Sequence, residues 1–259
     1  MSRSWVAATT GAIVATATTL ALAWPARWLD TWVWQASGQR VQMQQTQGPW
    51  WSGRTRLALW GGDGSRDVAR IPGELAWRIS PHWDQGPSLV LRVWAPCCVN
   101  DQLHVTVSWS SGWEWRIRDA HGQFDLTPLR GLGTPWNTLN LSGIASWRID
   151  GTRGMWRDGV PEVQGRWRVE LNRLSSDVST LAPLGNYTVD WQWRKNASAD
   201  WRLQTQAGVL QMAGQGQWTG RRLRFRGEAS SSPEAAAALS NLLNIMGRRQ
   251  GEKTILSIG

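Results

Sequence analysis

The strongest constraint on the fold is an alternation of apolar and polar residues, which dominates the sequence from Arg40 onward. Successive side chains of a strand point to opposite faces of a sheet, so this alternation places the apolar residues on one face. The pattern recurs at 75–79, 103–109, 113–117, 147–149, 167–171 and 187–193. We therefore expect an all-β protein whose antiparallel strands have one buried and one solvent-facing side.

Glycine and proline clusters separate these segments at short intervals. Examples are 61–64, 131–135 and 151–154. Regular spacing of such turns predicts a meander folded as a sandwich or as an open curved sheet. A loose echo places glycine close to tryptophan at 48–53, 73–77 and 216–220. The echo has no fixed period, so it does not indicate a repeat array.

One amphipathic helix is expected near the C-terminus. Ser232 is a suitable N-cap, Pro233 suits the first helical position, and Glu234 favours the positive end of the helix dipole. The predicted apolar stripe consists of Ala235, Ala238, Leu239, Leu242, Leu243 and Met246. Gly247 is the expected stop, and 254–258 is expected to form a last strand.

The N-terminal segment 5–24 contains no charged residue and has tryptophan at both ends. Twenty residues at about 1.5 Å each match the hydrocarbon core of a bilayer, about 30 Å thick. Two interpretations fit: a retained transmembrane anchor, or a signal peptide cleaved after residues 21–23, Ala-Leu-Ala. Both predict that the bulk of the chain is exported. Segment 25–38 is expected to form a short helix that lies on the membrane surface, stopped by Gly38.

The formal charge of the chain is +9, and arginine supplies nearly all of it, since Lys195 and Lys253 are the only lysines. The arginines often alternate with apolar residues, as Arg224 and Arg226 do around Phe225. This pattern is typical of a solvated strand face, and no nucleic-acid partner is expected. The 22 tryptophans are interpreted as the core and rims of sheets. A carbohydrate-binding or base-stacking surface is the alternative.

The sequence predicts no catalytic residue, no metal ligand and no cofactor site. His82, His104 and His121 have no metal-binding spacing, and no phosphate-binding loop or nucleophile motif is present. Asp63 and Asp67 lie in a glycine-rich segment and are interpreted as a solvated turn. We therefore expect a protein that is not an enzyme.

The two cysteines, Cys97 and Cys98, are adjacent. Ordinary disulfide geometry needs Cα atoms further apart than neighbouring residues, so a bond between these two requires strain. The pair is interpreted as having no structural role. A redox or intermolecular role is the alternative.

A set of structural motifs at both ends of the chain resembles one known family. The motifs are Pro25-Ala-x-Trp28-Leu29, Gly48-x-x-Trp51-x-Gly53, Leu181-Ala-Pro183-Leu184-Gly185-Asn-Tyr187, Gly214-x-Gly216-x-Trp218, Phe225-x-Gly227-x-Ala229, Pro233-Glu234, Leu242-Leu243, Met246-Gly247-Arg248 and Leu256-x-Ile258-Gly259. In this order they resemble protein N of the type II secretion system (GspN family). The middle third departs from the pattern by its cysteine pair and its excess of tryptophan.

The resemblance implies a single-pass inner-membrane protein that works with other inner-membrane subunits of the secretion machine, and it carries over no catalytic residue. It also favours the retained anchor. The expected layout is a cytoplasmic tail at 1–4, a transmembrane anchor at 5–24, a juxtamembrane helix at 25–38 and a periplasmic β-rich domain at 39–259. The competing function is lipid or glycolipid handling by an apolar groove in a curved sheet.

Overall fold

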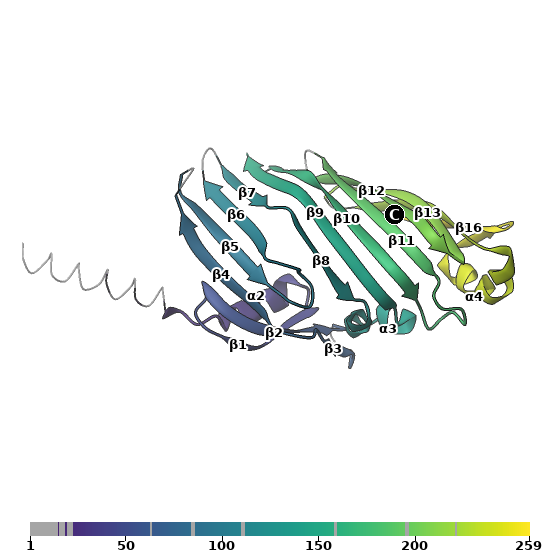
Figure 1. Cartoon of the computed structure of the whole chain (residues 1–259), viewed down its shortest axis with the longest axis horizontal. Coiled ribbons are helices and arrows are strands. Elements are labelled where there is room, and N and C mark those ends of the chain that lie inside the picture. Colours follow the sequence, from purple (N-terminus) through teal and green to yellow (C-terminus); the bar gives the residue numbers. More distant parts are fainter. Residues whose placement is uncertain are drawn as a thin grey trace, which may run out of the picture.

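The fold is a single antiparallel sheet of sixteen strands, seen in a computed structural model (Figure 1). The structure describes Ala15, Thr19 and residues 23–62, 64–83, 86–109, 112–157, 160–194, 197–220 and 222–259. The all-β prediction is confirmed. The sheet is open and curved, with β12 to β14 turning behind β11 (Figure 1), so the expected sandwich alternative is wrong.

The strands follow one another across the sheet almost in sequence order. The order is β1-β2-β4-β5-β6-β7-β9-β10-β11-β12-β13-β14-β16-β15, with β3 beside β2 and β8 beside β9. Their bounds are β1 Val41–Gln47, β2 Ser52–Trp60, β3 Val68–Arg70, β4 Leu75–His82, β5 Ser88–Trp94, β6 Leu103–Trp109, β7 Trp113–Ile117, β8 Ala120–Asp125, β9 Ser142–Arg157, β10 Val160–Ser175, β11 Gly185–Arg194, β12 Ser198–Gly208, β13 Leu210–Trp218, β14 Leu223–Ser231, β15 Arg248–Gln250 and β16 Lys253–Ile258. Each alternating segment of the sequence falls within one of these strands.

The register of the strands separates two faces. Val169 of β10 lies opposite Val189 of β11, which lies opposite Leu203 of β12. One residue earlier in β10, Arg168 lies opposite Asp190. We call the side that carries Val169 the apolar face and the side that carries Arg168 the polar face. Both faces belong to one layer, so a second element must cover the apolar face wherever it is buried.

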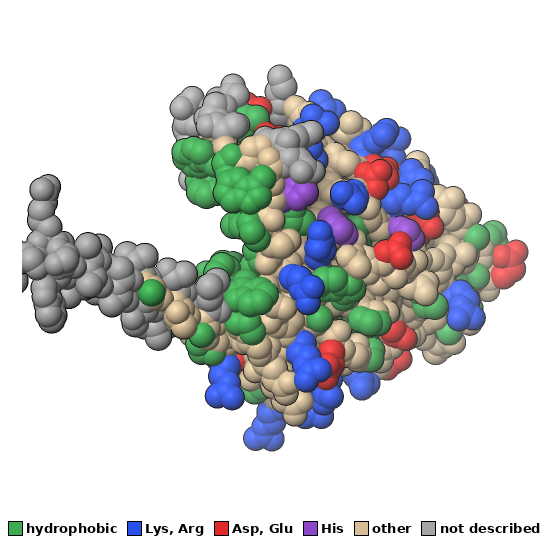
Figure 2. All heavy atoms as spheres, turned by 60° about the vertical axis from the view of Figure 1, so that its left-hand side comes forward, with side chains coloured by type: hydrophobic (Ala, Val, Ile, Leu, Met, Phe, Trp, Pro, Cys, Tyr) green, Lys and Arg blue, Asp and Glu red, His purple; other side chains and the backbone are tan. Residues whose placement is uncertain are grey.

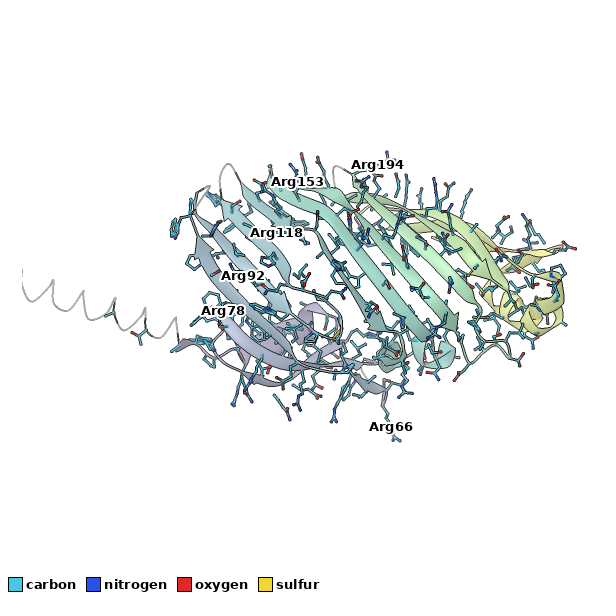
Figure 3. The ribbon with its side chains drawn as sticks, viewed as in Figure 1. Arg66, Arg78, Arg92, Arg118, Arg153 and Arg194 are labelled. Atoms are coloured by element: carbon cyan, nitrogen blue, oxygen red, sulfur yellow. A yellow bond between two sulfur atoms is a disulfide. The ribbon has the colours of Figure 1, made fainter. Side chains whose placement is uncertain are left out.

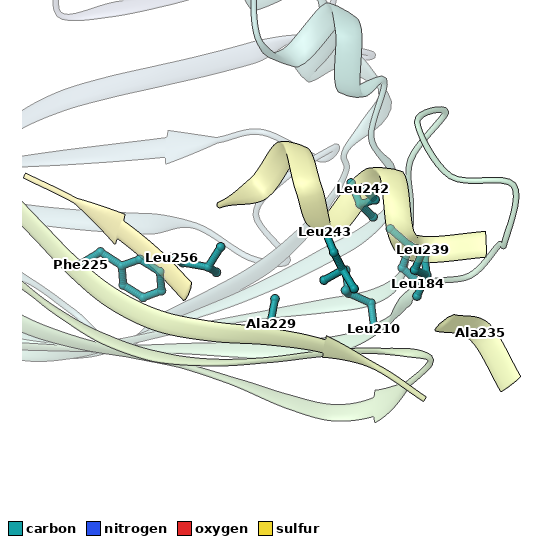
Figure 4. Close-up of a cluster of buried hydrophobic side chains, with 9 residues drawn as sticks. All are labelled: Leu184, Leu210, Phe225, Ala229, Ala235, Leu239, Leu242, Leu243 and Leu256. Carbon is teal, nitrogen blue, oxygen red and sulfur yellow. The ribbon is translucent and has the colours of Figure 1, made fainter. Parts of the chain in front are cut away.

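The C-terminal helix α4, Ala236–Met246, covers the apolar face at one end of the sheet. Leu239, Leu242 and Leu243 are buried there against side chains of the sheet (Figure 4). The sheet side of this core consists of Leu184, Leu210, Phe225, Ala229 and Leu256. The stripe predicted from the sequence therefore packs inward except at Ala238, which is exposed. Burial of large apolar side chains such as these leucines contributes roughly 1.5–3 kcal/mol each.

The two ends of this helix differ from the prediction. The chain enters through a 3₁₀ turn, Pro233–Ala235, and the Ser232 side chain makes no capping hydrogen bond. Gly247 has an extended backbone, with φ 178°, so it is not a left-handed helix stop. It leads directly into strand β15, which the sequence did not predict, and a Cβ there would collide with the backbone of Ile255.

A second buried cluster lies on the apolar face next to the first. It contains Leu126, Ala145, Leu174 and Tyr187. The Tyr187 hydroxyl donates a hydrogen bond of 2.9 Å to the carbonyl oxygen of Leu210. Burial raises the pKa of Tyr187 well above its ordinary value, so the hydroxyl stays protonated and keeps this bond.

Tryptophan rings of the apolar face lie over glycines of neighbouring strands. A Cβ on Gly53 would overlap the ring of Trp77, and a Cβ on Gly216 would overlap the ring of Trp201. Gly154 has the same relation to Trp115. Trp201 also stacks on Phe225, with ring centroids 4.6 Å apart. These contacts join neighbouring strands and not the glycine and tryptophan of one echo. Among the described tryptophans Trp77 is buried and eight are exposed, so the expectation that tryptophans form the core and rims of the sheet holds mainly for the rims.

Helix α2, Trp28–Ala36, lies against β1. The 3₁₀ turn η1, Thr127–Leu132, lies beside β2 and β3, and the short helix α3, Trp136–Leu139, lies against η1. The helix expected at 25–38 is thus present. Within the part of the chain that the structure describes, no helix is both long enough and apolar enough to cross a membrane. Nearly all of the predicted anchor, 5–24, lies outside the described residues.

Candidate functional site on the polar face

Basic side chains stand directly opposite one another on four neighbouring strand segments of the polar face. Arg78 of β4 pairs with Arg92 of β5, and Arg92 pairs with His104 of β6. The Arg118 amide donates a hydrogen bond of 3.0 Å to the carbonyl oxygen of His104, which extends the row by one strand. Like charges directly opposite each other destabilise a sheet. Packing alone therefore gives no reason for this arrangement.

The same feature continues toward the C-terminal end. His121 of β8 lies opposite Arg148 of β9, and Arg148 lies opposite Arg168 of β10. Figure 3 shows Arg78, Arg92, Arg118, Arg153 and Arg194 following one another across the sheet. Arg66 lies apart from them, below the sheet beside β3 (Figure 3). The basic side chains therefore form a band across the strands.

Three hollows lie along this band. Their volumes are about 420, 840 and 980 Å³. The first and second share Asp119, and the second and third share Asp150, Arg166, Gln192 and Arg194. Because neighbouring hollows share walls, they form one continuous depression, which we call the polar trough.

Arginine outnumbers aspartate in the walls of the polar trough. Nine arginines line it: Arg118, Arg148, Arg153, Arg166, Arg168, Arg194, Arg202, Arg224 and Arg226. Five aspartates line it: Asp101, Asp119, Asp150, Asp190 and Asp200. The excess of cations favours an anionic ligand.

Two ion pairs neutralise part of the positive charge of the trough. Arg168 Nε donates to Asp190 Oδ1 at 2.6 Å, and this contact raises the pKa of Arg168. Arg194 pairs with Asp200. Both arginines remain more than half exposed, so these pairs are weak, each contributing about 0.2–1 kcal/mol. They leave most of the cationic groups of the trough directed at solvent.

The positive charge of the band affects the pKa of His104. Its pKa is lowered first by burial and then by the positive charges of Arg118 and Arg92. The imidazole is therefore neutral at pH 7 and accepts or donates one hydrogen bond through each ring nitrogen. His121 lines the same hollow as His104, whereas His82 lies at the end of β4.

The other polar residues singled out in the sequence have structural contacts. The Asp67 carboxylate accepts hydrogen bonds from Ser65 Oγ at 3.1 Å and from Asn137 Nδ2 at 2.8 Å. Asp67 is half-buried in a loop, in keeping with the interpretation as a solvated turn, and its contact with Asn137 ties this loop to α3. Asp63 lies outside the described residues.

Cys97 and Cys98 form a disulfide bond with each other. The sequence interpretation gave this pair no structural role, but the bond lies within a turn that follows β5. In that turn the Cys98 amide donates to Ala95 at 2.8 Å, and the Cys98 carbonyl accepts a 2.9 Å hydrogen bond from Trp147 Nε1. Among the described residues, no group of three or more His, Cys, Asp and Glu side chains is placed to hold a metal ion.

The fold and the trough define a class: a large one-layer β protein with a cationic depression on its polar face. A comparison with models of protein families matches residues 39–255 to protein N of the type II secretion system (T2SS). The chain belongs to this family, since the match covers most of its length. Neither the curated proteins nor the solved structures contain a match to the chain. The family in general is a non-catalytic component of secretion, and membership implies contact with other parts of that machinery.

Proposed function

We propose that this protein is a non-catalytic, membrane-anchored component of the type II secretion system that supports assembly of the machine or export of folded proteins. The family match over residues 39–255 is the observation that carries this proposal. In the proposed layout residues 1–4 are cytoplasmic, 5–24 cross the inner membrane, and 39–259 lie in the periplasm. Tethering raises the local concentration of the sheet near membrane-bound partners by orders of magnitude.

Deletion of the gene tests the role in secretion. Cargo proteins should accumulate in the periplasm in folded form, because this machine exports proteins after they fold, and the full chain should restore secretion. An exported version without residues 5–24 should restore it poorly unless overproduced. Single substitutions of His82, His104 and His121 should leave secretion intact. Normal secretion in the deletion strain would reject the proposal.

The topology has its own test. A reporter fused after residue 40 should report the periplasm, and the chain should remain in the membrane at its full length. A soluble species that begins near Trp24 would show cleavage after residues 21–23 and would overturn the anchor. Crosslinking in intact cells should then capture other inner-membrane subunits.

A second candidate function is lipid or glycolipid handling, supported by the uncovered part of the apolar face. Leu89, Trp109, Trp113 and Trp156 are exposed at one end of their strands. Figure 2 shows hydrophobic side chains on both sides of a hollow in the surface. Altered outer-membrane lipid or detergent sensitivity in the deletion strain, together with normal secretion, would favour this function over the first.

A further inference from the structure

The basic band of the polar face is arranged in a way that stability does not explain. Arg92 lies opposite Arg78, and Arg148 lies opposite Arg168. Arg92 and Arg148 make no ion pair with any of the described residues. Repulsion between opposed cations lowers the stability of the free protein. An anionic ligand in the trough would remove the repulsion between Arg148 and Arg168, which both line it.

The polar trough is long in the direction across the strands. It runs from His104 on β6 to Arg226 on β14, which lie seven strand positions apart in the sheet. At about 4.8 Å per strand this distance is roughly 34 Å. An extended polypeptide rises about 3.4 Å per residue, so about ten residues would fill the trough. A single phosphate or lipid headgroup would occupy only a fraction of it.

Neutral amides lie between the arginines. Gln164, Gln192, Gln215 and Gln217 line the trough together with the charged groups. A carboxamide both donates and accepts hydrogen bonds, so it suits the N–H and C=O groups of a peptide backbone. Arginine suits carboxylates, which its guanidinium can bind with two parallel hydrogen bonds.

The trough offers no fully exposed aromatic ring to the two other anionic partners; Trp94 of β5, on the same face as Arg92, lines its first hollow but is half-buried. None of its lining residues belongs to the exposed large hydrophobic side chains of the described chain. Docking to a bilayer surface typically adds interfacial tryptophan to basic residues, and single-stranded nucleic acid needs exposed rings on which bases stack. The rings of Trp167, Trp191 and Trp201 belong to the apolar face, because these residues pair in one row across β10 to β12.

We propose that the polar trough is a docking site for an acidic polypeptide segment of about ten residues in extended conformation. The carboxylates of the segment would pair with arginines of β9, β10, β12 and β14, and its backbone with the glutamines between them. This inference does not depend on the role in secretion. If the chain acts in the secretion system, an acidic segment of a neighbouring subunit or of a cargo protein would be the ligand.

The test uses the full chain in neutral detergent micelles and two fluorescent ten-residue peptides, one of alternating Glu and Ser and one of alternating Gln and Ser. Fluorescence polarisation should show binding of the Glu peptide that weakens with added salt, because the contacts are between exposed charges. The double variant Arg148→Gln/Arg202→Gln should weaken binding about tenfold, since each exposed pair contributes up to several-fold. The matched control Arg66→Gln/Arg70→Gln, which removes the same charge outside the trough, should change it by less than about twofold.

Several results would overturn the proposal. One is equal binding of the two peptides, and another is an equal loss in the control variant. A third is binding of phosphatidylglycerol vesicles or of a single-stranded DNA oligonucleotide with no binding of the Glu peptide, which would assign the trough to a membrane or to nucleic acid. Unchanged melting temperatures in both variants would exclude misfolding as the cause of the loss. The assay is independent of secretion, so failure of the docking site and failure of the proposed function are distinguishable.

Discussion

The C-terminal end of the sheet and its middle strands β6 and β7 carry the same alternation of apolar and polar residues, yet they are buried to different degrees. At the C-terminal end, α4 covers the apolar face, and Leu239 is 0% exposed. In β6 and β7, which we call the uncovered strands, no residue is buried, and Trp109 at the tip of β6 is 56% exposed. Alternation thus decides which residues share a face. Burial is decided by whether another element of the chain reaches that face.

Where no helix covers the apolar face, packing takes place within the layer. Trp115 of β7 lies over Gly154 of β9, and Trp109 and Trp113 contact each other edge to face at 4.8 Å. Such contacts remove less apolar surface from water than a second layer does, so they contribute less stability. The covered end should therefore dominate the free energy of unfolding, and the uncovered strands are better suited to contacts with other molecules.

The largest effect is expected from a charge in the covered core. Leu242→Asp and Leu243→Asp each place a carboxylate at a buried site. The loss of apolar burial and the unpaired charge together should cost about 4 kcal/mol or more. Total stability is typically about 5–15 kcal/mol, so little folded protein should remain. Ile245→Asp on the same helix is the control, because Ile245 is 75% exposed and should tolerate the change in thermal melting. Equal melting of all three variants would mean that α4 does not cover the sheet.

Truncation of an apolar side chain should cost more stability at the covered end than in the uncovered strands. Leu239→Ala removes fully buried methyl groups and should cost about 2–5 kcal/mol. Val107→Ala in β6 removes half-buried groups and should cost about 1 kcal/mol or less. Urea unfolding of both variants measures the difference. Similar losses of unfolding free energy in the two variants would show that the uncovered strands are packed as tightly as the core.

Packing within the layer can be tested where Trp115 of the uncovered strand β7 lies over Gly154. A methyl group on Gly154 would overlap the Trp115 ring, so Gly154→Ala should lower stability by about 1–3 kcal/mol. Trp115→Ala in the same chain removes the ring that the methyl group meets. The two changes should therefore be strongly non-additive, which a double-mutant cycle on urea unfolding detects. Additive effects would contradict the close contact.

The smallest effect concerns the charge of the polar face. The folded-state pKa of His104 lies below the ordinary value of 6.5, so the unfolded chain binds this proton first as the pH falls. The contribution of neutral His104 to the free energy of unfolding should be fully present above pH 6.5 and should decrease slightly as the pH falls below that value. Arg92→Gln should raise the pKa of His104, measured by nuclear magnetic resonance titration, because it removes one of the lowering charges. Arg66→Gln should leave it unchanged, and an equal rise in both variants would contradict a local effect.

The sequence predicted the class of fold because a period of two follows from strand geometry alone. Segments such as 113–117 and 187–193 were assigned correctly as strands without any knowledge of their neighbours. The helix with Leu239 was predicted for the same reason, since its stripe follows the helical period. Its ends were predicted less well, because Ser232 and Gly247 have propensities for caps that the tertiary structure did not use.

The candidate site was not predictable in the same way. That arginines such as Arg148 and Arg168 lie on a polar face was visible from the alternation at 147–149 and 167–171. Their opposition to other basic residues depends on which strands pair and in what register, and the register shifts within β9 and β10. Apart from the glycine cluster 151–154, the sequence does not indicate where the β-bulges that cause these shifts occur.

The sequence by itself determined the strands, the two-sided character of the sheet, the family resemblance and the covering helix. The tertiary structure alone decided that there is one layer instead of two, that glycines lie under tryptophan rings and that a band of cations crosses the polar face. The physical reason is that local periodicity is set by backbone geometry, whereas strand partners, register and coverage are set by contacts between residues far apart in the chain. Those contacts appear only when the whole chain is folded.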